Sequence, residues 1–174
     1  MVKEKKFDFC TSCRKETSYK IIKKTVQKVI KDKSYEFKIA VAVCDECGKE
    51  MDIPGLFDLN IKSIDEQYRQ AEGLISIDDI QKIMDIYNIG KAPLSIALGF
   101  GEITITRYLS GQMPSKKYSD IIKKALSSPN YMIKLLNDNA EKMGETAYQK
   151  AIKAAEEIAG LFCVSDKMLL TISY

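Results

Sequence analysis

Two pairs of cysteines with identical spacing are the residues of this chain best suited to chemistry. Each of the segments Cys10-x-x-Cys13 and Cys44-x-x-Cys47 predicts a tight turn that directs two sulfurs at one centre. Two such turns supply the four thiolates of a tetrahedral zinc site, which leaves no coordination position for water or substrate. We therefore expect one structural Zn²⁺ ion, bound by all four cysteines.

A redox dithiol and a pair of disulfides are the competing interpretations of these cysteines. A redox motif needs only one pair, in a βαβ context. Disulfides are typical of secreted proteins, whereas this chain is rich in lysine, has an odd number of cysteines and shows no signal-like segment. The remaining cysteine, Cys163, is expected to be a small buried apolar residue rather than a reactive thiol.

Composition limits the function classes further. The 174 residues include no histidine and carry a formal charge of +3. Four thiolates and one Zn²⁺ together contribute −2, which brings the metal-loaded chain to about +1, so net charge does not indicate nucleic-acid binding. Without histidine the usual general base near neutral pH is missing, and we do not expect an enzyme. No apolar stretch approaches the ~20 residues of a membrane span. We expect a cytoplasmic, prokaryotic protein that does not bind membranes.

Residues 1–50 are predicted to form a small β domain around the metal. The segments 19–30 and 35–44 are rich in Ile, Val, Tyr and Phe with polar residues between them, and Lys31-Asp32-Lys33-Ser34 predicts the turn that joins them. Two strands that link two cysteine turns make a zinc ribbon, in which the metal substitutes for a large core. The many lysines are expected on solvated strand edges, where they discourage edge-to-edge pairing.

Helical patterns dominate the rest of the chain. Residues 51–75 are predicted to be a linker with a short helix that ends at Gly73. Residues 76–139 are predicted to be a bundle of five short helices, in which Ser76 is an N-cap, Ser128 precedes a helix and Gly99 and Gly111 end helices. The predicted fold class is thus α+β, a small β zinc-ribbon domain followed by an all-α helix-turn-helix bundle and C-terminal helices.

Residues 140–174 are expected to be a C-terminal extension. An alanine-rich amphipathic helix is predicted from Glu141 to Ala159, with Gly160 as its end. Ser165-Asp166 then predicts the start of another helix, and the residues that follow are still apolar at the last position of the sequence. We expect either the start of a further C-terminal segment or a helix for dimerisation or packing.

Two short helices that flank a glycine turn predict a helix-turn-helix. The second of these helices is expected from Glu102 to Ser110, with Gly101 as its N-cap. The stretch 98–111, Leu-Gly-Phe-Gly-Glu-Ile-Thr-Ile-Thr-Arg-Tyr-Leu-Ser-Gly, resembles the core motif of lambda-repressor-like (Xre-type) domains. The resemblance implies that Lys91 meets a phosphate and that Glu102, Ile103 and Arg107 face base edges. Ile103 stands where the family often has a polar residue and can touch only a thymine methyl, so no sequence preference is carried over.

The residues themselves allow two interpretations of the same surface. The guanidinium of Arg107 matches the O6 and N7 atoms of guanine, but an ion pair with a neighbouring carboxylate is the alternative. Glu102 can accept from cytosine N4 or act as a charge in the first helical turn. Lys116 and Lys117 begin a predicted helix and either contact phosphates or are solvated. Together, the predicted DNA-binding residues are Lys91, Glu102, Ile103, Thr106, Arg107, Lys116 and Lys117.

An N-terminal four-cysteine ribbon combined with this motif resembles the MqsA-type antitoxins over residues 10–136. The resemblance implies a homodimeric repressor that binds a palindromic double-stranded DNA operator and a cognate toxin protein. The alternative is a zinc-ribbon adaptor that binds only proteins and uses the helix-turn-helix for packing.

Overall fold

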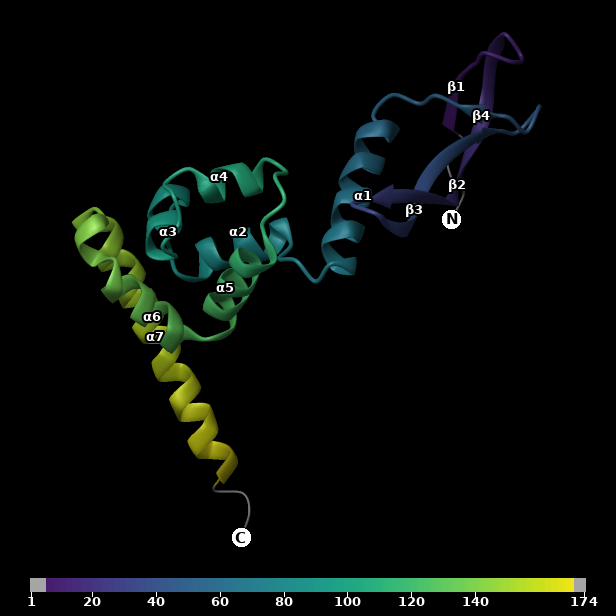
Figure 1. Ribbon diagram of the computed structural model, residues 1–174. Helices are drawn as coiled ribbons and strands as arrows, with labels where there is room; N and C mark the ends of the chain where they lie inside the picture. Colours follow the sequence, from purple (N-terminus) through teal and green to yellow (C-terminus); the bar gives the residue numbers. More distant parts are fainter. Residues whose placement is uncertain (1–5, 171–174) are drawn as a thin grey trace. The chain divides into compact units, whose positions relative to one another are not determined.

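The computed structural model describes residues 6–170, with side chains up to Leu161. The predictions for Cys163 and for residues 171–174 therefore lie outside the described part. The chain divides into two compact units, of which the first ends at Ala71 and the second begins at Glu72. Their elements (Figure 1) are β1 (Lys6–Cys10), β2 (Lys15–Ile30), β3 (Lys33–Cys44), β4 (Glu50–Met51), α1 (Leu56–Ala71), α2 (Ile77–Ile86), α3 (Lys91–Ala97), α4 (Thr104–Leu109), α5 (Lys116–Ser127), α6 (Pro129–Asp138), the 3₁₀ helix η1 (Ala140–Lys142) and α7 (Glu145–Leu170).

The N-terminal unit is built on an antiparallel sheet with the strand order β1-β2-β3-β4. The long hairpin β2–β3 matches the two predicted strands, and its turn consists of Lys31 and Asp32 between the paired residues Ile30 and Lys33. Both turn residues have positive φ, 50° and 63°, as a two-residue turn requires if it is to match the twist of its strands. The sequence did not predict β1 and β4, which add short strands beside the cysteine turns.

Helix α1 belongs to this unit and packs against β3. It spans 16 residues of the segment that was expected to hold a short linker helix. Tyr68 of α1 contacts Tyr35 of β3 edge to face, with ring centroids 5.2 Å apart. The neighbouring Phe37 of β3 is buried. The helix thus supplies apolar contacts that the small sheet cannot supply alone.

The C-terminal unit is a helical bundle with one hydrophobic core. Its buried residues recur every three or four positions along α2 to α7, and they include Ile80, Ile83, Leu94, Ile105 and Ile122. The predicted caps are confirmed: Ser76 accepts from the N–H of Asp79 at 2.9 Å, and Ser128 accepts from Tyr131.

Glycines end two of these helices, as predicted. Gly99 and Gly111 follow α3 and α4 and have φ of 74° and 101°, a region that favours glycine. Gly160 behaves differently, and the prediction that it ends a helix is wrong. Its φ is not positive, and α7 continues through it to Leu170, so Ser165-Asp166 opens no separate helix. Glycine inside a helix costs only about 1 kcal/mol, which a long helix tolerates.

Two helix starts also differ from the prediction. The third bundle helix begins at Thr104 rather than Glu102, because residues 101–104 form a turn in which the N–H of Thr104 donates to Gly101 O at 2.9 Å. The last helix begins at Glu145, after η1, rather than at Glu141. Glu102 therefore lies just before the N-cap Ile103 rather than in the first turn of the helix.

The prediction of an α+β fold is confirmed. Among the described residues, no helix combines the length and apolar character needed to cross a membrane.

Candidate metal centre and candidate nucleic-acid interface

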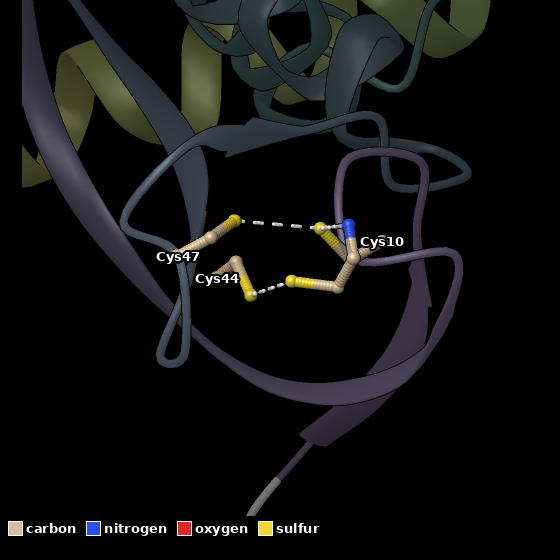
Figure 2. A group of neighbouring side chains, drawn as sticks. Cys10, Cys44 and Cys47 are labelled. Atoms are coloured by element: carbon tan, nitrogen blue, oxygen red, sulfur yellow. Dashed lines mark hydrogen bonds between the residues drawn. The ribbon is translucent and has the colours of Figure 1, made fainter.

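The four paired cysteines meet at one end of the sheet. Cys10 and Cys44 are the last residues of β1 and β3, and Cys13 and Cys47 lie in the turns that follow them. All four sulfurs lie within 4.8 Å of one another. Figure 2 shows the side chains of Cys10, Cys44 and Cys47 converging from two separate turns. Residues distant in the sequence are thus brought together by the antiparallel pairing of the strands.

The separations between sulfurs fit a tetrahedral metal ion. The Sγ atoms of Cys10 and Cys47 are 3.7 Å apart, and those of Cys13 and Cys44 are 3.9 Å apart. Four sulfurs that each lie about 2.3 Å from a zinc ion at the centre of a tetrahedron are about 3.8 Å from one another. The four cysteines are therefore positioned to hold one metal ion.

The two turns have the same backbone design. The N–H that follows the second cysteine donates to the carbonyl of the first, from Arg14 to Cys10 at 2.7 Å and from Gly48 to Cys44 at 3.0 Å. Within the first turn the N–H of Cys13 also points at the sulfur of Cys10, 3.4 Å away. These bonds fix the direction of the sulfurs before any metal binds.

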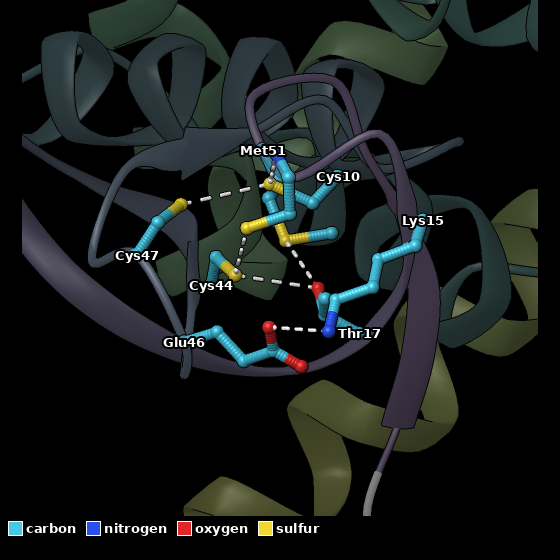
Figure 3. A network of polar contacts seen from close by, with 8 residues as sticks. Cys10, Lys15, Thr17, Cys44, Glu46, Cys47 and Met51 are labelled. Carbon is cyan, nitrogen blue, oxygen red and sulfur yellow. Dashed lines mark hydrogen bonds and ion pairs between the residues drawn. The ribbon is translucent and has the colours of Figure 1, made fainter.

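Thr17 and Met51 form the inner wall of the centre, and sequence reasoning missed both. The hydroxyl of Thr17 lies 3.3 Å from the sulfur of Cys44 and 3.9 Å from the sulfur of Met51 (Figure 3). Both residues are buried, and each stands four positions after the second cysteine of its pair. That matching offset, from Cys13 and from Cys47, is the signal by which they could have been found.

Polar contacts near the centre also hold the second turn against β2. Ser18 donates from its hydroxyl to the carboxylate of Asp45 at 2.8 Å, and its carbonyl accepts from the N–H of Asp45 at 3.0 Å. Lys15 forms an ion pair with Glu46 at 2.9 Å, also visible in Figure 3. Both partners of the ion pair are about half exposed, so its contribution to stability is small.

Hydrogen bonding divides the protons unequally among the sulfurs. The hydroxyl of Thr17, helped by the backbone N–H of Cys47, lowers the pKa of the Cys44 thiol to about 6. The hydrogen bond with the Cys47 side chain, followed by burial, raises the pKa of the Cys13 thiol to about 12. Cys44 therefore loses its proton more readily than Cys13, and binding of a metal ion must displace the proton of Cys13.

Helices α3 and α4 in the other unit are two short helices joined by a turn, at the place where a helix-turn-helix was predicted. Ser95 of α3 is buried and joins the two helices: its hydroxyl donates to the carbonyl of Lys91 and accepts from the N–H of Ile105, both at 3.0 Å. Ile105 and Tyr108 turn the inner face of α4 into the core. Beside the turn, Phe100 stacks on Tyr118 of α5, with ring centroids 4.3 Å apart.

Most of the predicted DNA-binding residues lie on the exposed side of α4, in the turn before it or at the start of α3. Glu102, Ile103, Thr106 and Arg107 are all exposed, and Ile103 keeps 54% of its surface. Lys91 is exposed at the start of α3. The alternative for Arg107 was an ion pair with a neighbouring carboxylate. Among the described residues, Arg107 makes no such pair.

The two lysines at the start of α5 differ from each other. Lys116 donates to the carbonyl of Gly73 at 2.8 Å and pairs with Asp120 at 3.2 Å, whereas Lys117 is exposed. Lys123 donates to the same carbonyl at 2.8 Å. Lys116 thus has a structural partner within its own unit, although its side chain remains accessible.

No protein-family model matches the chain, and no curated protein matches it. Function must therefore be inferred from the residues and their geometry.

Proposed function

We propose that this protein is a sequence-specific, double-stranded-DNA-binding transcriptional regulator that carries one structural Zn²⁺ ion. The observation that supports it most is the division of α4 into two faces. Ile105 and Tyr108 anchor the helix in the core, while Thr106 and Arg107 point outward with Ile103 just before the helix. A short helix held in this way by a preceding helix is the arrangement that enters the major groove in helix-turn-helix proteins.

In the proposed docking mode, α4 lies in the major groove. Arg107 donates to O6 and N7 of a guanine, and Ile103 contacts a thymine methyl. Lys91 and the α5 lysines Lys116 and Lys117 contact phosphates, which set the position and register of the protein without reading sequence. In this mode Glu102, which precedes α4, accepts from a cytosine N4.

The metal centre has a structural role in this proposal. Four thiolates in a tetrahedron are the donor set that zinc prefers, and all four positions are filled by protein. When bound, the ion would link the β1–β2 and β3–β4 turns and so replace the core that this small sheet lacks. No enzymatic activity is proposed for it.

The combination of a four-cysteine β unit and a helix-turn-helix unit supports a more specific role, that of an MqsA-type antitoxin. Such a protein represses its own operon and neutralises a toxin protein. As a homodimer it would bind a palindromic operator whose half-sites are separated by about one turn of DNA, ~34 Å.

The deciding experiment measures binding of the zinc-loaded protein to a duplex from its own promoter and to a scrambled duplex of equal length and composition. We expect the promoter to be bound more tightly, typically by a factor of about 10³ or more at physiological salt. Equal affinity for the two duplexes across several salt concentrations would contradict the proposal.

A protein-binding adaptor is the second candidate function. Phe7 and Phe9 favour it, because both are apolar, lie on the same face of β1 and are largely exposed. An adaptor would show no preference between the two duplexes.

A further inference from the structure

The sheet of the N-terminal unit has one closed edge and one open edge. The closed edge belongs to β3, beside which helix α1 lies (Figure 1). The amide of Gln67 accepts from the N–H of Lys38 and donates to its carbonyl, both at 2.8 Å. The amide of Asn60 does the same for Ala40, at 2.8 and 2.7 Å. Strand β4 then pairs with the next part of this edge, from Ala42 onward.

The open edge belongs to β2. Strand β1 pairs only with the segment 15–19 of β2, and no described strand pairs with the outer side of residues 20–30. Unpaired strand edges invite pairing with another chain, and proteins usually cover or shorten them. Within residues 6–170, side chains of α1 thus cover part of the β3 edge, whereas no strand covers the outer side of residues 20–30 of β2.

The alternation of the backbone shows which groups the open edge offers. A residue in an antiparallel sheet directs its N–H and C=O to one neighbouring strand, and the next residue directs them to the other. The backbone N–H and C=O groups of Lys38 and Ala40 bond to α1 and so point away from β2. The groups of the residue between them and of the residue after Ala40 therefore point toward β2, where the paired residues are Lys24 and Ile22. The carbonyl of Ser18 agrees with this parity, because it bonds to Asp45 on the β3 side. The outward groups of the open edge therefore belong to Ile21, Lys23, Thr25, Gln27 and Val29.

The side chains along this edge have a regular pattern. One face of β2 carries, in order, Lys20, Ile22, Lys24, Val26, Lys28 and Ile30, a strict alternation of cations and apolar residues. No acidic residue occurs between positions 20 and 30. Lys24 pairs with Glu50 across the sheet at 2.6 Å. In the described part of the chain, Lys20 and Lys28 have no hydrogen-bonded or ionic partner.

We propose that the open edge of β2 binds an extended acidic segment of a partner protein, which adds to the sheet as an antiparallel or parallel strand. The bare backbone groups supply main-chain hydrogen bonds, and the side-chain pattern supplies specificity. Carboxylates at every fourth position of the partner lie opposite the lysines, with apolar residues midway between them opposite Ile22 and Val26. This inference is independent of the DNA-binding proposal.

A second copy of this chain fits the edge less well. Two copies could pair their open edges as symmetric antiparallel strands. Of the registers that pair the whole edge, only the one centred on Thr25 places no lysine of one copy opposite a lysine of the other. Even there the lysines meet Ile22, Val26 and Ile30 instead of carboxylates. A nucleic acid would use the lysines but neither the outward N–H groups nor the exposed apolar side chains, of which Ile21 keeps 47% and Val29 74% of its surface.

The test uses the full chain, loaded with equimolar zinc, and a fluorescent synthetic peptide as long as the open edge. The peptide repeats Glu-Thr-Val-Thr, which places acidic and apolar residues alternately on one face. Binding is measured by fluorescence anisotropy. Thr25→Pro removes an outward N–H from an edge position that tolerates proline, whereas Thr25→Ala keeps that N–H. We expect Thr25→Pro to weaken binding about tenfold or more, because a partner carbonyl loses its donor, and Thr25→Ala to bind like the parent chain.

A second pair of variants keeps the test decisive if Thr25→Pro does not fold, as judged by circular dichroism and zinc content. The double substitution of Lys20→Gln and Lys28→Gln should weaken binding about fivefold, while Lys62→Gln on the exposed surface of α1 should not. A peptide with Lys in place of Glu should not bind the parent chain. The promoter duplex should bind all these variants equally.

Three results would overturn the inference. One is that a folded Thr25→Pro protein binds the acidic peptide as tightly as Thr25→Ala. Another is that the acidic peptide does not bind, or binds no better than its lysine counterpart. The third is sedimentation showing a dimer of the parent chain that Thr25→Pro dissociates, which would assign the edge to a second copy.

Discussion

Arg14 and Gly48 occupy the same position in the two cysteine turns. Each directly follows the second cysteine, each donates its N–H to the carbonyl of the first, and each has positive φ, 57° and 70° respectively. Only glycine adopts this region without strain, so the first turn carries a conformational cost that the second avoids.

The first prediction follows from this difference. Arg14→Gly should raise the free energy of unfolding of the N-terminal unit, and Gly48→Ala should lower it, each by about 1 kcal/mol. A Cβ at Gly48 would meet no atom within 4 Å, so its effect is one of backbone conformation rather than of crowding. Urea unfolding of the zinc-loaded protein measures both variants. Effects of the same sign in the two variants would contradict the prediction.

The second prediction concerns removal of the metal. The two units have separate hydrophobic cores, one around Cys10, Ala42, Cys44 and Met51 and one spread over the helices. A zinc chelator should therefore unfold the sheet and leave α2 to α6 intact. Hydrogen exchange should show loss of amide protection in β1 to β4 and α1 but not in α2 to α6, and Cys44→Ser should reproduce that result without chelator. Simultaneous loss of protection in α2 and α5 would count against two independent cores.

The third prediction concerns the hydrogen bond between Ser95 and Ile105. Ser95→Ala leaves the N–H of Ile105 buried without an acceptor, which should cost about 1–3 kcal/mol of stability in the helical unit. Ser110→Ala is the control, because this exposed hydroxyl bonds only within α4 and its loss should cost less than about 0.5 kcal/mol. Thermal unfolding compares the two. Equal losses of stability would show that the hydrogen bond between Ser95 and Ile105 contributes no more than the exposed one of Ser110.

Local signals explain why parts of this structure could be predicted from the sequence. The metal centre followed from spacing alone, because a Cys-x-x-Cys turn determines where its sulfurs point whatever lies around it. The starts of α2 and α6 followed from Ser76 and Ser128, whose hydroxyls satisfy N–H groups only a few residues away. Features that depend on contacts within a few residues need no knowledge of the fold.

The missed features depend on distant contacts. Helix α1 was expected as a linker helix because its Asn60 and Gln67 look like ordinary polar surface residues, yet they bond to the edge of β3. Strands β1 and β4 are short and gain their pairing from β2 and β3 rather than from their own composition. Gly160 was expected to end a helix, but a glycine does so only when its backbone turns left-handed, which neighbouring sequence does not determine.

The last prediction separates sequence reading from positioning in the proposed DNA complex. Arg107→Ala should weaken binding to the cognate duplex by about 1–3 kcal/mol and relax the preference at one base pair, because a base-edge contact is lost. Lys91→Ala should instead weaken binding to cognate and scrambled duplexes alike and reduce the slope of log K against log salt by about one unit. Lys62→Ala, in the other unit, is the matched control and should change neither quantity.

The contrast between Arg107 and Lys91 rests on their positions. Arg107 lies on the exposed side of α4 with no ion pair among the described residues to hold it, while Lys91 precedes the core-anchored part of α3. Affinities for cognate, single-base-changed and scrambled duplexes at several salt concentrations give both quantities in one series. If Arg107→Ala lowers affinity for every duplex equally and reduces the salt slope as Lys91→Ala does, Arg107 contacts a phosphate and another residue reads the bases. Exposed Thr106 and Ile103 would then be the next residues to substitute, since they share the outer surface of the same motif.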